Sequence, residues 1–215
     1  MKFVRKVYAI LACQLTITTS MIAAVQYNDK FRTYAIYNQG MAWACFAGAM
    51  TSMCAIVCCL GRKVPHNYIL LLIFTLCESY MVAGLTARYE PNLVMTAGLA
   101  TALVTIALTV YAMYTKVNIE IFYAMVFVIY LAMFPLMIFG FFIRLKALYI
   151  LYCCLGLVFY SIFLIIDTMQ ICNSNKSLGG YAVEYDDYII GALQLYLDII
   201  MIFVYILKIL GAARD

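Results

Sequence analysis

The stretch LQLYLDIIMIF (residues 193–203) places a carboxylate, Asp198, in the middle of a run that is otherwise almost entirely apolar. The same pattern occurs twice more, with Glu78 in FTLCESYMV and Asp167 in FLIIDTMQI. A charged side chain at the centre of a bilayer costs from about 2.5 to more than 10 kcal/mol. Acids at such positions therefore need a proton, a partner or water, and three of them point to a function.

The composition around these acids is that of a membrane protein. Of the 215 residues, 67% are hydrophobic and 11% are charged, whereas charged residues make up about 25% of a soluble domain. The mean hydropathy is +1.00. The net charge of +4 is spread over loop ends, so no basic surface for nucleic acid is expected. The expected surroundings of the chain are membrane lipid.

Hydropathy divides the chain into seven apolar segments of about twenty residues, the length that crosses the hydrocarbon layer. They cover residues 7–27, 41–60, 68–87, 93–115, 121–141, 147–171 and 189–210. The sequence therefore predicts an all-α, polytopic membrane protein whose single domain (1–215) is a seven-helix bundle. Because Asp198 weakens the last segment, the sequence leaves open whether that segment spans the membrane or is re-entrant.

The N-terminus carries three basic residues, Lys2, Arg5 and Lys6, before the first segment. By the positive-inside rule these residues favour a cytosolic N-terminus, although the basic residues of the other loops are balanced between the two sides. The apolar run that follows continues to about Val25 without an obvious small-residue cleavage site. We expect it to be a membrane helix and not a cleaved signal peptide.

The cysteine and histidine content argues against metal or covalent chemistry. Eight of the nine cysteines lie in apolar runs, where they behave as small hydrophobes, and the one histidine, His66, cannot complete a zinc site with them. The Gly-x-Gly-Asp signature of presenilin-type membrane proteases does not precede Asp198, and a Ser/His dyad would have to use His66 in a loop. We expect no enzyme activity and no cofactor.

The buried acids favour a proton-sharing pair. Asp198 lies on one helical face with four other polar or small residues: Gly191, Gln194, Tyr205 and Lys208. Lipid cannot solvate that face, so it should point into the bundle. Between Asp167 and Asp198 lie 30 residues, which allow two antiparallel spans to bring the acids level. Two adjacent carboxyls share a proton and titrate as a unit. The alternatives are acids that serve packing alone or, for Asp167, a carboxylate that reaches the interface.

Four stretches carry a resemblance to a known family. They are VRKVYAILACQLTIT, NYILLLIFTLCESYMVAGLTARY, FLIIDTMQI and DDYIIGALQLYLDIIMIFVYILKILG. Over nearly the whole chain the sequence resembles the transmembrane BAX-inhibitor-motif proteins, and most of all their Lifeguard and Golgi anti-apoptotic branch. The most specific parts are the Ile-Asp-Thr of the sixth segment and the Leu-Tyr-Leu-Asp of the last.

The resemblance implies a seven-helix fold around a central, acid-bearing C-terminal helix. It implies calcium leak from intracellular stores, pH dependence and suppression of cell death. The hydrogen-bonded aspartates that gate the family's pore match Asp167 and Asp198, and the membrane glutamate of the Golgi branch matches Glu78. The family's acidic pair before the last span, typically Glu-Glu, matches Asp186 and Asp187.

The resemblance also sets the remaining expectations. The family's basic cluster is shortened here to Arg62 and Lys63, which are possible counter-ions to the acids. Glu78, Asp186, Asp187 and Gln194 are candidates for the ion pathway, and Asp167 and Asp198 are the candidate metal ligands. The expected function is a pH-sensitive calcium leak channel of the endoplasmic reticulum or Golgi, with calcium and protons as the transported ions. The alternatives are a proton-coupled calcium exchanger and a non-conducting scaffold that regulates death-pathway or receptor partners.

Overall fold

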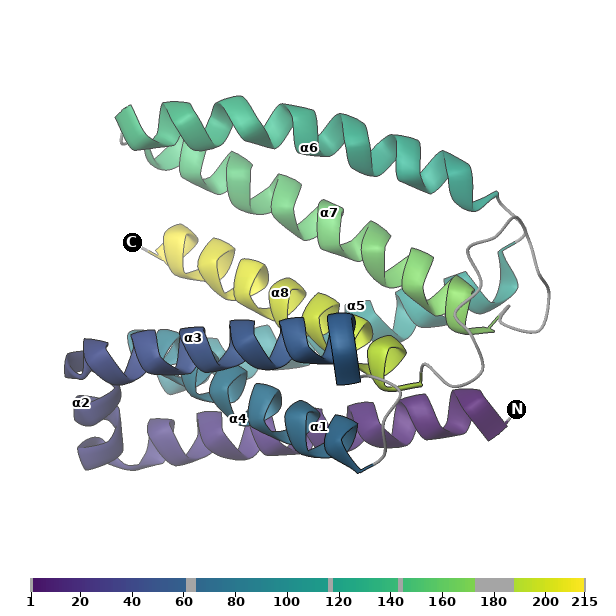
Figure 1. The fold of residues 1–215 in the computed structure, drawn as a ribbon. Coiled ribbons are helices and arrows are strands. Elements are labelled where there is room, and N and C mark those ends of the chain that lie inside the picture. Colours follow the sequence, from purple (N-terminus) through teal and green to yellow (C-terminus); the bar gives the residue numbers. More distant parts are fainter. Residues whose placement is uncertain (1, 61–64, 116–117, 143–144, 173–187, 215) are drawn as a thin grey trace. The chain divides into compact units, whose positions relative to one another are not determined.

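The computed structural model describes residues 2–60, 65–115, 118–142, 145–172 and 188–214, and every regular element in these ranges is a helix (Figure 1). The helices are α1 (Lys2–Tyr27), α2 (Asp29–Tyr37), α3 (Gln39–Ala55), α4 (His66–Thr86), α5 (Pro91–Tyr114), α6 (Ile119–Phe142), α7 (Lys146–Cys172) and α8 (Tyr188–Arg214). A π-helical turn, η1 (Ile56–Leu60), follows α3. The predicted all-α fold class is confirmed.

Seven of these helices are long and apolar enough to cross a membrane. The candidate spans are Phe3–Tyr27, Gln39–Cys58, His66–Thr86, Pro91–Tyr114, Ile119–Ile138, Lys146–Cys172 and Tyr188–Arg214, and each overlaps one predicted segment. The one remaining α-helix in the described part of the chain, α2, lies between the first two predicted segments, where the sequence suggested a loop. The last segment is a continuous helix of 27 residues, or about 40 Å at 1.5 Å per residue. That length favours a full crossing over a re-entrant hairpin.

The described chain divides into two compact units. The first unit contains α1 to α4 and the start of α8 up to Tyr196, and the second contains α5 to α7 and the rest of α8 from Leu197. Within the apolar window of each span, 78% of the residues are buried in α8 and between 6% and 39% in the other six. The high burial of α8 agrees with the expectation that the acid-bearing C-terminal helix avoids lipid. The single domain of the sequence analysis stays a prediction.

In the first unit, α4 packs against both α1 and α3. The contact between α1 and α4 contains buried polar groups: Gln14 Nε2 donates to Thr75 Oγ1 at 3.0 Å, and Thr18 Oγ1 lies 2.8 Å from Ser79 Oγ. Helices in lipid associate through close packing and such interhelical hydrogen bonds, because lipid tails are as apolar as the side chains they would replace. Polar residues thus identify the α1–α4 interface.

Hydrogen bonds at its start and from its middle hold the short helix α2 in place. At its start, Asn28 Oδ1 accepts a bond from the backbone N–H of Lys30 at 3.1 Å. From its middle, Arg32 donates from Nε to the carbonyl of Ala87 at 2.9 Å and from Nη2 to the carbonyl of Tyr89 at 3.3 Å. These carbonyls follow the last turn of α4, where a helix leaves C=O groups unpaired and favours a cation.

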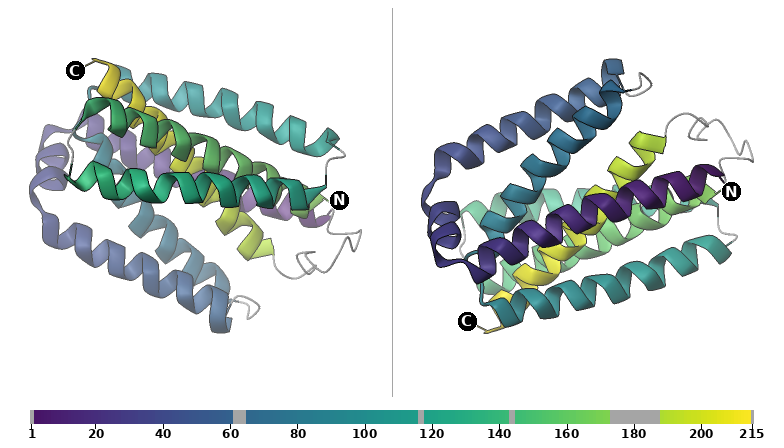
Figure 2. Two further views of the ribbon diagram at one scale, coloured as in Figure 1. Left: turned by 90° about the horizontal axis from the view of Figure 1, so that it is seen from above. Right: turned by 90° about the horizontal axis from the view of Figure 1, so that it is seen from below.

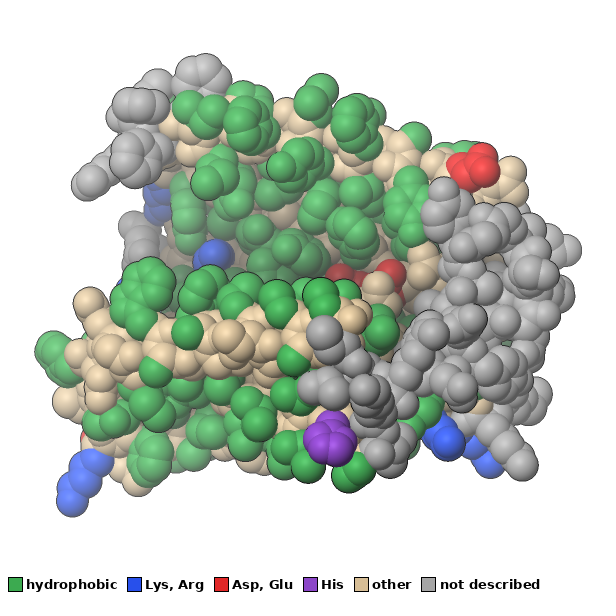
Figure 3. All heavy atoms as spheres, in the orientation of Figure 1, with side chains coloured by type: hydrophobic (Ala, Val, Ile, Leu, Met, Phe, Trp, Pro, Cys, Tyr) green, Lys and Arg blue, Asp and Glu red, His purple; other side chains and the backbone are tan. Residues whose placement is uncertain are grey.

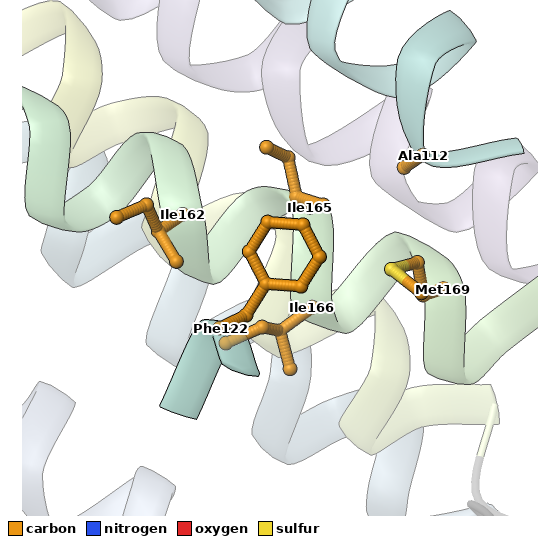
Figure 4. Packing of buried hydrophobic residues seen from close by; sticks show 6 residues of the cluster. All are labelled: Ala112, Phe122, Ile162, Ile165, Ile166 and Met169. Carbon is orange, nitrogen blue, oxygen red and sulfur yellow. The ribbon is translucent and has the colours of Figure 1, made fainter. Parts of the chain in front are cut away.

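In the second unit, α5, α6 and α7 meet in one apolar cluster (Figure 4). Its buried members are Ala112, Phe122, Ile162, Ile165, Ile166 and Met169. The left view of Figure 2 shows α6 beside α7, in agreement with their direct packing. The outward side of α6 is covered by exposed hydrophobic side chains (Figure 3), which is the surface expected to face lipid.

The packing of α7 against α8 depends on one glycine. A Cβ atom added at the buried Gly156 would overlap the ring of Tyr205. The same ring lies between two tyrosines of α7, with centroid distances of 6.3 Å to Tyr152 and 5.8 Å to Tyr160. Gly156 therefore gives Tyr205 its place on α7, and this contact fixes the position of one helix along the other.

We expect replacement of Arg32 by Ala to destabilise the first unit. A hydrogen bond from a charged donor contributes about 1.5–3 kcal/mol, so the free energy of unfolding should fall by about that amount. The midpoint of thermal unfolding in detergent, followed by circular dichroism, measures the effect. Lys30→Ala on the same helix is the matched control, because Lys30 is exposed. An equal fall in both variants would contradict the role of Arg32.

We expect Gly156→Ala to be destabilising although alanine is the better helix former. Overpacking in a filled contact costs about 1–3 kcal/mol, which outweighs the gain of about 1 kcal/mol in helix propensity. Gly98→Ala is the control, because a Cβ atom there meets nothing within 4 Å, so it should be neutral or stabilising. Thermal unfolding of both variants in detergent decides the matter, and a Gly156→Ala protein as stable as the control would refute the close contact.

Candidate functional site

The two aspartates predicted to pair lie together in the second unit. Asp167 on α7 is 8% exposed and Asp198 on α8 is 6% exposed, and their carboxyl groups are hydrogen-bonded to each other. An ionised carboxylate can only accept hydrogen bonds. The bond between them therefore needs one shared proton, which leaves the pair with a single negative charge.

One carboxyl oxygen of the pair is left without a hydrogen bond from the described residues. Asp198 Oδ2 is buried and has no hydrogen-bond partner in the described part of the chain. No described Lys or Arg forms an ion pair with either aspartate. Buried polar atoms without a partner are rare in proteins and call for an explanation. The Asp198 Oδ2 atom is an acceptor to which a proton or a water could bind.

The register of α7 and α8 places the aspartates level with each other. Tyr160 lies seven residues before Asp167, and Tyr205 lies seven residues after Asp198. Their rings are in contact at 5.8 Å, so α7 and α8 run antiparallel. Seven residues are about two helical turns, or about 10 Å. The acid pair and the tyrosine pair thus lie on one face of the two helices, and Tyr160 is close enough to Asp198 to interact with it electrostatically.

The rest of the predicted polar face of α8 is also largely covered. Gly191 and Tyr205 are buried, and Gln194 and Lys208 are half-buried. The Lys208 ammonium lies 5.4 Å from the centre of the Tyr205 ring, a favourable cation–π distance. The prediction that this face avoids lipid agrees with the burial of each of these residues.

Glu78 belongs to the first unit. It is half-buried on α4, next to a cluster of three hydroxyls in which Thr18 Oγ1 lies 2.8 Å from both Ser79 Oγ and Tyr196 Oη. Glu78 interacts electrostatically with Tyr196. Sequence reasoning missed this cluster. Its only signal was the presence of small hydroxyl residues inside apolar spans, and nothing in the sequence says which of them meet.

Four predicted residues lie outside the described part of the chain. These are the possible counter-ions Arg62 and Lys63 and the candidate pathway acids Asp186 and Asp187. Among the described residues, no three side chains of the His, Cys, Asp and Glu types come together in a group that could hold a metal. At the acid pair a metal ion would therefore meet two carboxyls, and water would have to supply its other ligands.

Comparison with known proteins identifies the family. A family model described as "Inhibitor of apoptosis-promoting Bax1" matches residues 1–215. Protein lifeguard 3 of Homo sapiens is 31% identical over 215 residues, which cover 97% of this chain and 68% of that protein. The Mus musculus protein of the same name is 31% identical over 219 residues, covering 99% and 69%.

A second Lifeguard protein matches over most of its own length. Protein lifeguard 4 of Mus musculus is 31% identical over 218 residues, covering all of this chain and 86% of that protein. The match extends through the spans that carry both aspartates, and the resemblance found in the sequence is confirmed. The chain is a multi-pass integral membrane protein that belongs to the family of inhibitors of apoptosis-promoting Bax1.

Proposed function

We propose that this protein is a pH-sensitive calcium leak channel of endoplasmic reticulum or Golgi membranes, with its N-terminus in the cytosol. Membership of the Bax-inhibitor family supports an anti-apoptotic role in a membrane. In this proposal the leak sets the calcium content of the store, and a lower content weakens death signals that depend on calcium release. The Lifeguard names of the similar proteins agree with this role.

The observation that carries the proposal is the hydrogen-bonded carboxyl pair of Asp167 and Asp198 in an apolar interior. A pair retained only for packing would be more stable with a permanent partner, such as a lysine or an amide. A shared proton is instead a partner that can leave. This property suits a gate that responds to pH and a site that admits a cation once the proton has gone.

The energy available from the pair is large enough to move a helix. When the shared proton leaves, two like charges about 4 Å apart repel by about 4 kcal/mol at an effective dielectric constant of 20. A differential free energy of that size shifts a two-state arrangement by a factor of about 1,000. Since α7 and α8 each carry one of the charges, the repulsion acts directly between these two helices.

The ionised pair also suits calcium chemically. Calcium takes six to eight oxygen ligands from carboxylates, carbonyls, hydroxyls and water. Two carboxylates would offer part of such a set, and water would complete it. A site so incomplete binds weakly, which conduction requires, since an ion must be able to leave.

A proton-coupled calcium exchanger is a second candidate, because the same pair binds either a proton or a cation. The two functions differ in whether the proton crosses the membrane with each turnover. A non-conducting scaffold is the outcome in which the purified protein passes no calcium at any pH.

We expect calcium flux into liposomes that contain only the purified protein to vary with pH, and Asp167→Asn or Asp198→Asn to remove that variation. Asparagine keeps the shape of the side chain but cannot share a titrating proton. Since the pair acts as a unit, the double variant should add little to either single one. A calcium dye inside the vesicles measures the flux, and a pH dye in a parallel sample detects proton counter-transport.

Glu120→Gln is the matched control, because Glu120 is an exposed acid of the same unit. Its flux should keep the wild-type pH profile. A wild-type profile in both aspartate variants would remove the pair from the mechanism, and a wild-type protein that passes no calcium would favour the scaffold.

A further inference from the structure

A cavity of about 500 Å³ lies where α6 ends and α7 begins, away from the acid pair. It is lined by Leu136, Met137, Gly140, Leu145, Lys146, Leu148, Tyr149 and Tyr152. The proposed function makes no use of this cavity. Its volume is within the range of about 300–1,000 Å³ that is typical of ligand sites.

The walls of the cavity are apolar and accessible from the bilayer. Met137 is 66% exposed, Leu145 57% and Tyr149 44%. On the α6 side Gly140 leaves the floor open, since a Cβ atom added there meets nothing within 4 Å. These residues lie at the ends of two spans, where tyrosines are enriched at the level of the lipid headgroups. A molecule that fills the cavity must therefore be apolar along most of its length.

One end of the cavity is positively charged. Lys146 is exposed and is the first residue of α7. At this helix start the backbone N–H of Tyr149 donates to the carbonyl of Leu145 at 3.2 Å, and the first N–H groups of a helix have no partner within the helix. A lysine beside such a helix start is a combination that favours phosphate.

A second cation lies beyond Tyr152, one of the lining residues. Tyr152 contacts the ring of Tyr205 at a centroid distance of 6.3 Å, and the Lys208 ammonium lies 5.4 Å from the centre of that ring. No Asp or Glu of the described chain lines the cavity. Glu120, on the same helix as Gly140, lies twenty residues earlier, about 30 Å along the axis. The charge at this end of the unit therefore favours an anion.

We infer that the cavity binds one anionic phospholipid from the bilayer. One of its two acyl chains lies along the apolar wall formed by Leu136, Met137 and Leu148, over the open floor at Gly140. Its phosphate is bound by Lys146 and by the N–H groups of the first turn of α7. A lipid is the occupant that the observations favour, because the cavity opens between two spans and combines an apolar trough with a cation at headgroup level.

The test is photocrosslinking in nanodiscs of phosphatidylcholine. Phosphatidylglycerol with a diazirine in its acyl chain is present as a tracer, and phosphatidylcholine with the same diazirine is the comparison. Mass spectrometry of the digested protein measures adducts in residues 136–152. We expect phosphatidylglycerol to label this segment about fivefold more, the factor that one lysine provides near an anionic headgroup. Inorganic phosphate should not compete, which distinguishes a lipid from a free anion.

Two variants with matched controls separate the trough from the charge. Gly140→Leu fills the trough and should abolish labelling by both lipids, whereas Gly98→Leu on α5, also at an open glycine, should leave it unchanged. Lys146→Gln should remove the preference for phosphatidylglycerol and keep labelling by phosphatidylcholine, whereas Lys30→Gln on α2 should keep the preference.

Equal labelling by the two lipids in the wild-type protein would show ordinary boundary lipid and overturn the inference. So would an unchanged preference in Lys146→Gln, or competition by phosphate alone. If Gly140→Leu fails to fold, the wild-type ratio and the Lys146→Gln variant still decide the outcome.

Discussion

The hydrogen bond between the carboxyls of Asp167 and Asp198 is the constraint on which the packing of α7 and α8 depends. Neither acid is tolerable alone in an apolar interior, so the two helices must hold their side chains level. Two turns away the contact between Tyr160 and Tyr205 keeps the same register, and Gly156 gives the Tyr205 ring its place. The packing of Tyr205 against Tyr160 and Gly156 thus helps to keep Asp167 and Asp198 level with each other.

The two units satisfy their buried polar groups in different ways. In the first unit Thr18, Ser79 and Tyr196 form a cluster of hydroxyls. A hydroxyl can both donate and accept a hydrogen bond, so these contacts need no charge and no shared proton. In the second unit the acid pair depends on a proton that can leave. Since α8 carries both Tyr196 and Asp198, one continuous helix combines a permanent polar contact with a titratable one.

Hydropathy locates the seven spans and the acids within them because a bilayer demands long apolar helices and makes any charge conspicuous. The 30 residues between Asp167 and Asp198 allow an antiparallel pairing of the last two spans, but the sequence alone left open acids that serve packing only. The short helix α2 was not predicted from the sequence, because its nine residues are polar on average. It is stabilised by the Asn28 cap and by hydrogen bonds from Arg32 to carbonyls after α4, which hydropathy does not reveal. The sequence also does not distinguish Gly156 from the other glycines of the spans, because its role depends on the contact with the Tyr205 ring.

In the proposed function, the shared proton would link calcium and acid at this site whatever the mode of transport. A divalent cation is fully balanced by two carboxylates only after the proton has left, so the two ions exclude each other from the pair. A leak channel and an exchanger would therefore both respond to pH, and the response alone does not separate them. What separates them is the path of the proton: in a leak it returns to the side from which it came, and in an exchanger it crosses. Asp198 Oδ2 is buried and unpartnered in the described chain, so it is the acceptor at which the binding step of either proposed mechanism would begin.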